Sequence, residues 1–279
     1  MRISILFWCY KEPEVCADRV GLLRHHNPST PIYVLYGGDI EGKDAMAKAL
    51  NEFIDDFWHF DLDRMPHWKW IQGDRLLARW YLKRGSKLPN WNHLFVVQWD
   101  MLVAASIDRL LHKMPENAAI FTGRLELKKV KEWWKWVRGP KNRIRLALFR
   151  LRLLIIERYV GAIFTAPFIC VSAPRAYFHR LSRTPLGELG FVEYRCPTFA
   201  EAWGFTHWTT AQLAAWRPKN PMTRDIPENR KIISASKRSV HPALIYAELQ
   251  KPNGFRVFHP VHGISTDIGL GDLPYKASP

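Results

Sequence analysis

Asp100 is the residue whose place in the sequence most directly indicates chemistry. It follows the apolar run Leu94 to Val97, which is typical of a buried strand, after Gln98 and Trp99. A carboxylate at the end of a buried strand is costly unless it is hydrogen-bonded, paired or bound to a metal. In open α/β sheets, ligands also bind at the carboxyl ends of the strands. Asp100 therefore belongs either to a ligand site or to the N-cap of a following helix, a role that aspartate often takes.

The segments that would position Asp100 alternate between strands and helices. The pattern predicts strands at 3–9, 31–36, 55–60, 94–97 and 118–122, and helices at 14–26, 44–53, 72–84 and 106–114. A loop is expected around Pro66, Trp68 and Trp70. This alternation favours an α/β fold with a mostly parallel central sheet flanked by helices.

The sequence becomes basic and rich in tryptophan after Gly123. Residues 124–158 contain 12 Lys and Arg against 3 Glu, and Trp133, Trp134 and Trp136 lie among them. Residues 141–158 form a helical pattern with two apolar faces, one of which contains Ile144 and Leu148 and the other Phe149 and Leu153. Because each apolar face needs an apolar neighbour, we expect one to meet the core. The other would meet an anionic membrane surface, through residues 124–158, or a second copy in a homodimer, through residues 141–158.

The composition narrows the class of protein. With 47% apolar residues in 279, the chain is long enough for a sizeable core. A net charge of +15 favours an anionic partner, which leaves nucleic acid, membranes and phosphorylated substrates. The four cysteines lack metal-site spacing and predict free thiols in a reducing compartment. Without a recognisable signal peptide or membrane span, a cytoplasmic location is expected, with possible peripheral attachment to the inner face of the membrane.

Four segments, in their order along the chain, resemble the GT-A-type nucleotide-diphospho-sugar glycosyltransferases. They are the first strand with its Glu-Pro turn at 12–13, the strand end Tyr36-Gly37-Gly38-Asp39, the strand end Gln98-Trp99-Asp100, and the late His259-Pro260-Val261-His262. Gln98-Trp99-Asp100 stands where that family has its DxD motif, with glutamine in place of the first acidic residue. The resemblance implies a Rossmann-like GT-A fold with a basic helical insert.

The resemblance also implies a divalent metal site and a donor site. Asp100 would bind Mn²⁺ or Mg²⁺, together with His259 or His262. The residues implied to bind the nucleotide sugar are Tyr10, Tyr36, Asp39, Arg75, Gln98, Trp99 and Asp100. Each of Tyr36, Asp39 and Arg75 also has an ordinary structural interpretation, as the edge of a core, a turn residue and a solvated helix charge.

Glu193 and Glu201 are the candidate catalytic bases, because an inverting transferase must deprotonate the acceptor hydroxyl. Alternatively, Glu201 forms a capping box with Thr198, and Glu193 pairs with a basic residue such as Arg195. Residues expected on the acceptor side are Thr122, Gly123 and Trp203.

These interpretations predict a single catalytic domain over residues 1–279. Its parts would be a nucleotide-sugar-binding half (1–123), the basic insert (124–160), an acceptor-side half (161–264) and a tail (265–279). The expected activity is metal-assisted transfer of a sugar, as by a hexosyltransferase, from a nucleotide-diphosphate-sugar donor to a glycan or lipid-linked acceptor.

Two other functions remain open. The basic, tryptophan-containing segment would suit a non-enzymatic nucleic-acid-binding protein, although no RRM, KH, OB or helix-turn-helix signature occurs. A sugar nucleotidyltransferase would need a glycine-rich phosphate loop after the first strand, and Tyr10-Lys11-Glu12-Pro13 has no glycine. No P-loop, dinucleotide-binding, zincin or nucleophile-elbow motif occurs.

Overall fold

A computed structural model describes residues 1–60, 66–89, 91–132, 134–185, 189–216, 231–235 and 238–266. Its strands are β1 (Ile3–Cys9), β2 (Ile32–Tyr36), β3 (Asp56–His59), β4 (His93–Gln98), β5 (Leu102–Val103), β6 (Ala118–Phe121), β7 (Leu125–Glu126), β8 (Phe164–Thr165), β9 (Cys170–Pro174), β10 (Thr206–His207) and β11 (Val257–Phe258). Its α-helices are α1 (Pro13–His26), α2 (Lys43–Leu50), α3 (Pro66–Ile71), α4 (Gly73–Trp80), α5 (Ile107–Leu110), α6 (Pro140–Ile155), α7 (Arg175–Arg183), α8 (Val192–Ala202) and α9 (Pro242–Leu249).

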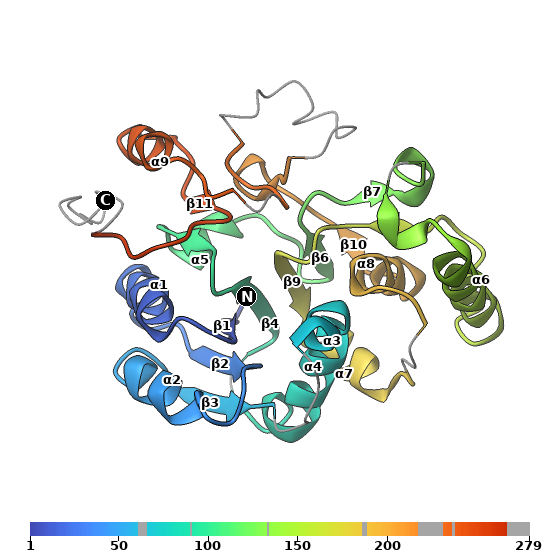
Figure 1. Ribbon diagram of the computed structural model, residues 1–279, viewed down its shortest axis with the longest axis horizontal. Helices are drawn as coiled ribbons and strands as arrows, with labels where there is room; N and C mark the ends of the chain where they lie inside the picture. The colour runs from blue at the N-terminus through green and yellow to red at the C-terminus, as the bar shows by residue number, and fades with distance from the viewer. Residues whose placement is uncertain are drawn as a thin grey trace.

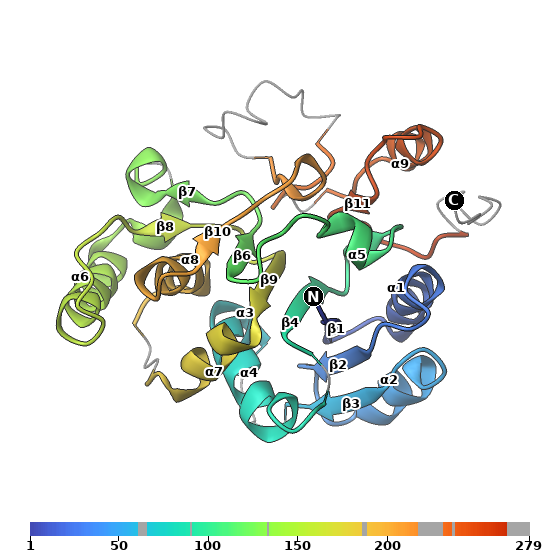
Figure 2. The ribbon, with the colours of Figure 1, turned by 180° about the vertical axis from the view of Figure 1, so that it is seen from behind.

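A seven-stranded sheet runs through the molecule in the order β10-β6-β9-β4-β1-β2-β3 (Figures 1 and 2). β1 is parallel to β2 and β4, and the pairs β2/β3 and β6/β10 are also parallel. β9 is antiparallel to both of its neighbours, β4 and β6. The predicted α/β class, with a mostly parallel sheet flanked by helices, is therefore confirmed.

Alternating residues of the strands supply two hydrophobic cores, one on each face of the sheet. Ile5 and Phe7 of β1 pack with residues of α1, α2 and α5. Leu6 and Trp8 pack with residues of α4, α7 and α8 on the other face. Every residue of β1 is buried, as expected for a parallel strand covered on both faces. Figure 1 shows α1 and α2 on one side of the sheet, and α3, α4 and α7 on the other.

The segment expected to be a loop around Pro66 is the helix α3. Proline is favourable as the first residue of a helix because its fixed φ suits the first turn. Trp68 then stacks on Phe60 with ring centroids 6.4 Å apart, which ties α3 to the end of β3. The capping box expected at Thr198 is also wrong, because Thr198 lies inside α8 and its hydroxyl donates to the carbonyl of Phe164 over 3.2 Å.

The predicted two-faced helix is α6, and only one of its apolar faces is covered. Phe149 and Leu153 are buried, and Phe149 contacts the rings of Tyr194 and Phe199 on α8. The opposite face, which contains Ile144 and Leu148, is exposed. No helix in the described part of the chain has both the length and the apolarity needed to cross a bilayer.

The tryptophans of the basic segment pack inward where they are described. Trp136 stacks on Phe191 with ring centroids 4.1 Å apart, and Trp134 contacts Phe191 and Tyr194. Trp133 lies outside the described residues, as does the predicted tail from residue 267 onward. Trp134 and Trp136 therefore pack against the hydrophobic core, and their rings are not part of an exposed surface on which nucleic-acid bases could stack.

The segment after α9 returns to the carboxyl end of β4. β11 pairs antiparallel with β5, and the backbone N–H of Val261 donates to the carbonyl of Asp100 over 2.8 Å. The buried guanidinium of Arg19 on α1 donates to the carbonyls of Val261 and Gly263 over 3.3 and 2.7 Å. These contacts fix residues 259–263 beside the carboxyl end of β4.

A buried histidine in β4 makes the stability of the fold depend on pH. His93 is 1% exposed, and neither ring nitrogen has a hydrogen-bond partner in the described structure. Burial lowers the pKa of His93 to about 3. Below pH 6.5 this histidine is protonated in the unfolded chain, whereas in the folded chain it stays neutral down to about pH 3. The free energy of unfolding therefore falls as the pH drops through this range.

We expect His93 alone to lower the free energy of unfolding by about 2 kcal/mol between pH 7 and pH 5. In a His93→Leu variant, the free energy of unfolding should fall by about 2 kcal/mol less between pH 7 and pH 5 than in the wild-type protein. Urea denaturation at both pH values measures the difference. Equal losses in the variant and the wild-type protein would contradict the assignment.

Candidate functional site

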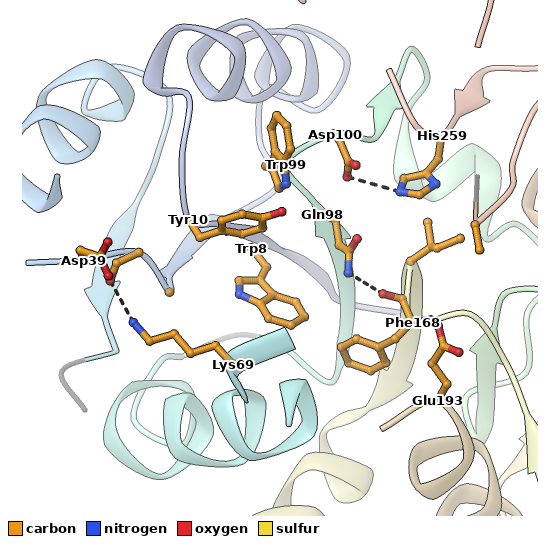
Figure 3. A pocket seen from close by; sticks show the side chains of 14 residues that line it. Trp8, Tyr10, Asp39, Lys69, Gln98, Trp99, Asp100, Phe168, Glu193 and His259 are labelled. Atoms are coloured by element: carbon orange, nitrogen blue, oxygen red, sulfur yellow. Dashed lines mark hydrogen bonds and ion pairs between the residues drawn. The ribbon is translucent and has the colours of Figure 1, made fainter. Parts of the chain in front are cut away.

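A pocket of about 430 Å³ opens at the carboxyl ends of β1, β2 and β4 (Figure 3). Its size is typical of small-molecule sites. The residues that line it are Trp8, Tyr10, Gly37, Gly38, Asp39, Lys69, Gln98, Trp99, Asp100, Phe168, Ile169, Glu193, Ala235 and His259. Because β2, β1 and β4 are parallel neighbours, their carboxyl ends lie together, and this brings Tyr10, Asp39 and Asp100 to one pocket.

Asp100 faces His259 in this pocket. The carboxylate Oδ1 of Asp100 lies 3.3 Å from Nε2 of His259, as Figure 3 shows. The contact has the length of an ion pair, but neither atom has a hydrogen-bond partner among the described residues. Asp100 is not a helix cap, because the chain continues into β5 and the next helix, α5, begins at Ile107.

The backbone around His259 fixes the orientation of its ring. Nδ1 of His259 lies 2.7 Å from the carbonyl oxygen of Ser234, which can only accept, so Nδ1 carries a proton. Nε2 is then the ring nitrogen that faces Asp100. His259 also pairs with Ile233 in a short parallel bridge, which holds its backbone.

Asp100 is ionised at neutral pH. Burial raises the pKa of Asp100, but the contact with the imidazole of His259 outweighs it, and the net pKa lies below the usual value. The stability that this carboxylate contributes is present above its unfolded pKa, near 3.9, and is lost as the pH falls through its lower folded value.

Gln98 spans the gap between β4 and the loop before β9. Its amide Nε2 donates to the carbonyl of Phe168 over 2.5 Å. This bond assigns the amide orientation, because a carbonyl cannot donate. Figure 3 shows the amide oxygen of Gln98 on the side of Asp100. Glutamine in this position therefore presents a neutral oxygen to the pocket.

Aromatic rings make up one wall of the pocket. Trp8 meets Phe168 edge to face with centroids 5.7 Å apart, and Tyr10 meets Trp99 in the same way at 5.7 Å. A Cβ on Gly73 would lie 2.6 Å from the Trp8 ring, so the start of α4 needs glycine to accommodate this wall. Trp8 was not among the residues predicted from the sequence, although strand alternation places it on the same face as Tyr10.

Two charged side chains enter from other elements. Lys69 of α3 is 7% exposed, and its ammonium donates to the carbonyl of Gly38 over 3.2 Å. Glu193 of α8 accepts the backbone N–H of Phe168 over 3.3 Å and lines the pocket beside Phe168. Lys69 does not stand out in the sequence, because the pattern around Pro66 indicates a loop. The only signal was a lysine between two tryptophans.

Two residues predicted for the donor site do not line the pocket. Tyr36 packs on the α1 side of the sheet, where its ring stacks on Phe57 with centroids 5.9 Å apart. The guanidinium of Arg75 lies over the ring of Trp68 at 5.3 Å and lines a separate depression.

The candidate base Glu201, the predicted acceptor-side residues and the candidate metal ligand His262 do not line the pocket either. Glu201 forms an ion pair with Arg124 over 2.5 Å. Trp203 stacks on Phe199, and the buried hydroxyl of Thr122 donates to the carbonyl of Cys170. Gly123 follows Thr122 with φ at 66°. His262 is exposed and stacks on Trp99 from outside.

The described residues contain no cluster of three or more His, Cys, Asp or Glu side chains able to hold a metal. Asp100 and His259 are therefore the two acidic or imidazole side chains of the described pocket that could bind a metal together. Further ligands would have to come from Gln98, water or substrate oxygens.

Comparisons with known proteins give structural similarity only. No protein-family model and no curated sequence matches the chain. The galactosyltransferase LgtC, solved in complex with donor and acceptor sugar analogues, is similar over 63% of this chain with 13% identity and a TM-score of 0.37. The chain spans 59% of that protein's length. Mouse xyloside xylosyltransferase 1, in its apo form, is similar over 75% of this chain and 85% of its own, with 9% identity and a TM-score of 0.37. The function is therefore inferred below from the pocket itself.

Proposed function

We propose that the chain is a glycosyltransferase that takes a sugar from a nucleotide-diphosphate-sugar donor with the help of a divalent cation. The observation that supports this most directly is the Asp100–His259 pair at the carboxyl end of a parallel sheet, since its facing oxygen and nitrogen lack hydrogen-bond partners in the described structure. The acceptor proposed is a glycan or lipid-linked sugar.

The residues present fit a divalent cation. An ionised carboxylate and a neutral imidazole nitrogen are suitable ligands for Mn²⁺, and the second nitrogen of the imidazole is held by a backbone carbonyl, as is common for metal-bound histidine. Mg²⁺ would favour oxygen ligands, so it would rely more on Asp100, Gln98 and the donor diphosphate. When bound, the cation would offset the charge that develops on the leaving nucleoside diphosphate.

The protein residues around this pair suit the rest of the donor. Trp8 and Tyr10 offer ring surfaces for the base or the sugar, and Asp39 follows the Gly37-Gly38 turn with a carboxylate suited to a ribose hydroxyl. A Cβ on Gly38 would lie 2.5 Å from the backbone oxygen of Tyr10, so this turn can bring its backbone close to β1 only with glycine. Lys69 adds a buried positive charge near the same turn.

Glu193 is the proposed base that accepts the proton of the acceptor hydroxyl. It is the only one of the two candidate glutamates, Glu193 and Glu201, that lines the pocket, and its Oε1 is held by the N–H of Phe168. Glu201 is neutralised by Arg124 and is not carried into the proposal.

Thermal unfolding with Mn²⁺ and a panel of nucleoside diphosphates and nucleotide sugars tests the proposal. One nucleotide at 100 times its dissociation constant should stabilise the fold by about 2.7 kcal/mol, seen as a melting shift of a few degrees, and only with the metal present. The base of that nucleotide would identify the donor. If no nucleotide changes the melting temperature, and the protein binds random single-stranded DNA in a salt-sensitive way, the nucleic-acid alternative would be favoured instead.

A further inference from the structure

The outward face of α6 is apolar and uncovered in the described structure. Ile144, Leu148, Leu151 and Ile155 lie on one side of this 16-residue helix and are 60%, 45%, 50% and 61% exposed. We refer to these four residues as the α6 face. An apolar patch of this kind on the solvent-exposed surface of a protein is typical of an interaction site.

Basic residues lie along both edges of the α6 face. By helical geometry, Lys141 and Arg145 follow one edge, and Arg143 and Arg150 follow the other. Two of the three glutamates in residues 124–158 are paired within the protein: Glu157 with Arg152 and Arg180 at 3.5 and 3.0 Å, and Glu126 with Lys128 at 2.5 Å. The face therefore combines an apolar centre with a positive rim.

A groove of about 500 Å³ extends from the helix beside this face. Its apolar lining includes Leu153, Leu154, Val160 and Ile163. Arg150 and the ion-paired Lys128 and Glu126 line it as well. Val160, which follows α6 in the chain, is 85% exposed and lines the same groove. Both the groove and the α6 face thus pair apolar side chains with positive charge.

We propose that α6 lies in the interfacial layer of an anionic lipid bilayer, with the α6 face inserted and its basic edges among the lipid head groups. An amphipathic helix with an apolar stripe between lysines and arginines binds such surfaces by buried apolar area and by attraction to anionic lipid. The helix lies parallel to the membrane plane and does not cross it. This inference does not depend on the proposed catalytic function.

A second copy of the chain fits this face less well than a bilayer does. In a two-fold dimer the same patch meets itself, so the basic edges of two α6 helices would approach each other. No acidic residue occurs between Lys141 and Ile156 to pair with them. An anionic surface supplies the missing negative charge.

Binding to vesicles tests the inference. Full-length protein should float with vesicles of phosphatidylcholine and phosphatidylglycerol, less so with phosphatidylcholine alone, and less in high salt. Neutralising three exposed edge residues (Lys141→Gln, Arg143→Gln, Arg150→Gln) should weaken the partition coefficient roughly 100-fold, since each contributes about fivefold near an anionic surface. The matched control removes three exposed lysines elsewhere (Lys48→Gln, Lys83→Gln, Lys87→Gln) and should change binding little.

An environment-sensitive label distinguishes insertion from simple charge attraction. All four native cysteines are buried in the described structure, so a Leu151→Cys variant can be labelled selectively. Its dye should shift to the blue with anionic vesicles, while a dye at Leu82→Cys, another exposed leucine, should not.

Three results would overturn the inference. The first is no flotation of the wild-type protein with anionic vesicles, and the second is binding that is unaffected by neutralising the α6 edges. The third is a dimer in light scattering that is disrupted by Leu148→Ser and Leu151→Ser together, with no blue shift on vesicles, which would make the α6 face a contact between copies. Circular dichroism and melting of each variant verify that it is folded.

Discussion

Replacing Asp100 with asparagine should lower metal-dependent sugar transfer roughly 1000-fold, because a divalent cation supplies several kcal/mol to the stabilisation of a charged leaving group. Asparagine keeps the shape of the side chain and removes its charge, so the fold should persist. The lowered pKa of Asp100 shows that the pocket favours the ionised carboxylate, which is the form that binds a cation.

Binding and transfer measured separately distinguish the roles within the pocket. Isothermal titration with the nucleotide found by thermal unfolding should show that Asp100→Asn binds it more weakly than the wild-type protein. Adding Mn²⁺ should no longer raise the affinity of this variant for the nucleotide. Glu193→Gln should retain donor binding and lose transfer to the acceptor, as expected for a base. Asp108→Asn, an exposed acid on α5, is the matched control and should leave both unchanged. Metal-dependent binding that survives in Asp100→Asn would remove the central claim.

Replacing Asp74 with alanine should lower the free energy of unfolding by about 3–5 kcal/mol, because it leaves a buried guanidinium without its counter-charge. Asp74 on α4 and Arg195 on α8 are both fully buried. Nε of Arg195 donates to Oδ2 of Asp74 over 2.7 Å, and one Nη donates to Oδ1 over 2.5 Å. Gln72 and the carbonyl of Gly190 accept the other guanidinium donors over 2.7 and 3.1 Å.

Urea denaturation of a double-mutant cycle measures this coupling. Asp74→Leu with Arg195→Met removes both charges and should destabilise less than Asp74→Leu or Arg195→Met alone. Simple additivity of the single variants would contradict the interpretation. Because Glu193 is two residues from Arg195 on α8, loss of this ion pair should also lower transfer through displacement of Glu193, with little change in donor affinity.

The strands could be predicted from the sequence, because runs such as Ile3–Cys9 and Leu94–Val97 are apolar without interruption and parallel strands are buried on both faces. The ends of these strands follow from the runs, and the run before it singles out Asp100. The donor-site roles of Tyr10, Asp39, Gln98 and Trp99 are implied only by the GT-A resemblance, and these residues line one pocket with Asp100. The start of α3 at Pro66 could not be predicted, since a proline can indicate a loop as well as the first turn of a helix, and the position of Lys69 depends on this helix. Which of Glu193 and Glu201 faces the pocket depended on the rotation of α8, and no local pattern determines that.

The α6 helix illustrates a similar limit. Its two apolar faces were visible as a periodicity, but which of them is covered depends on contact with Tyr194 and Phe199, residues distant in sequence. The pairing of His259 with Asp100 was expected only from the resemblance, and its geometry required β11 to return to β5.

The return of β11 separates the assembly of the scaffold from the assembly of the site during synthesis. Every strand of the seven-stranded sheet ends at or before His207, whereas His259 and the Val261 contact to Asp100 come afterwards. A ribosome-bound chain that has emerged only as far as β10 would contain the whole sheet and half of the proposed metal pair. The competence to bind a cation would thus arise only once the last segment has docked against α1 through Arg19, and a chain that ended at β10 would have every strand of the sheet but would lack His259.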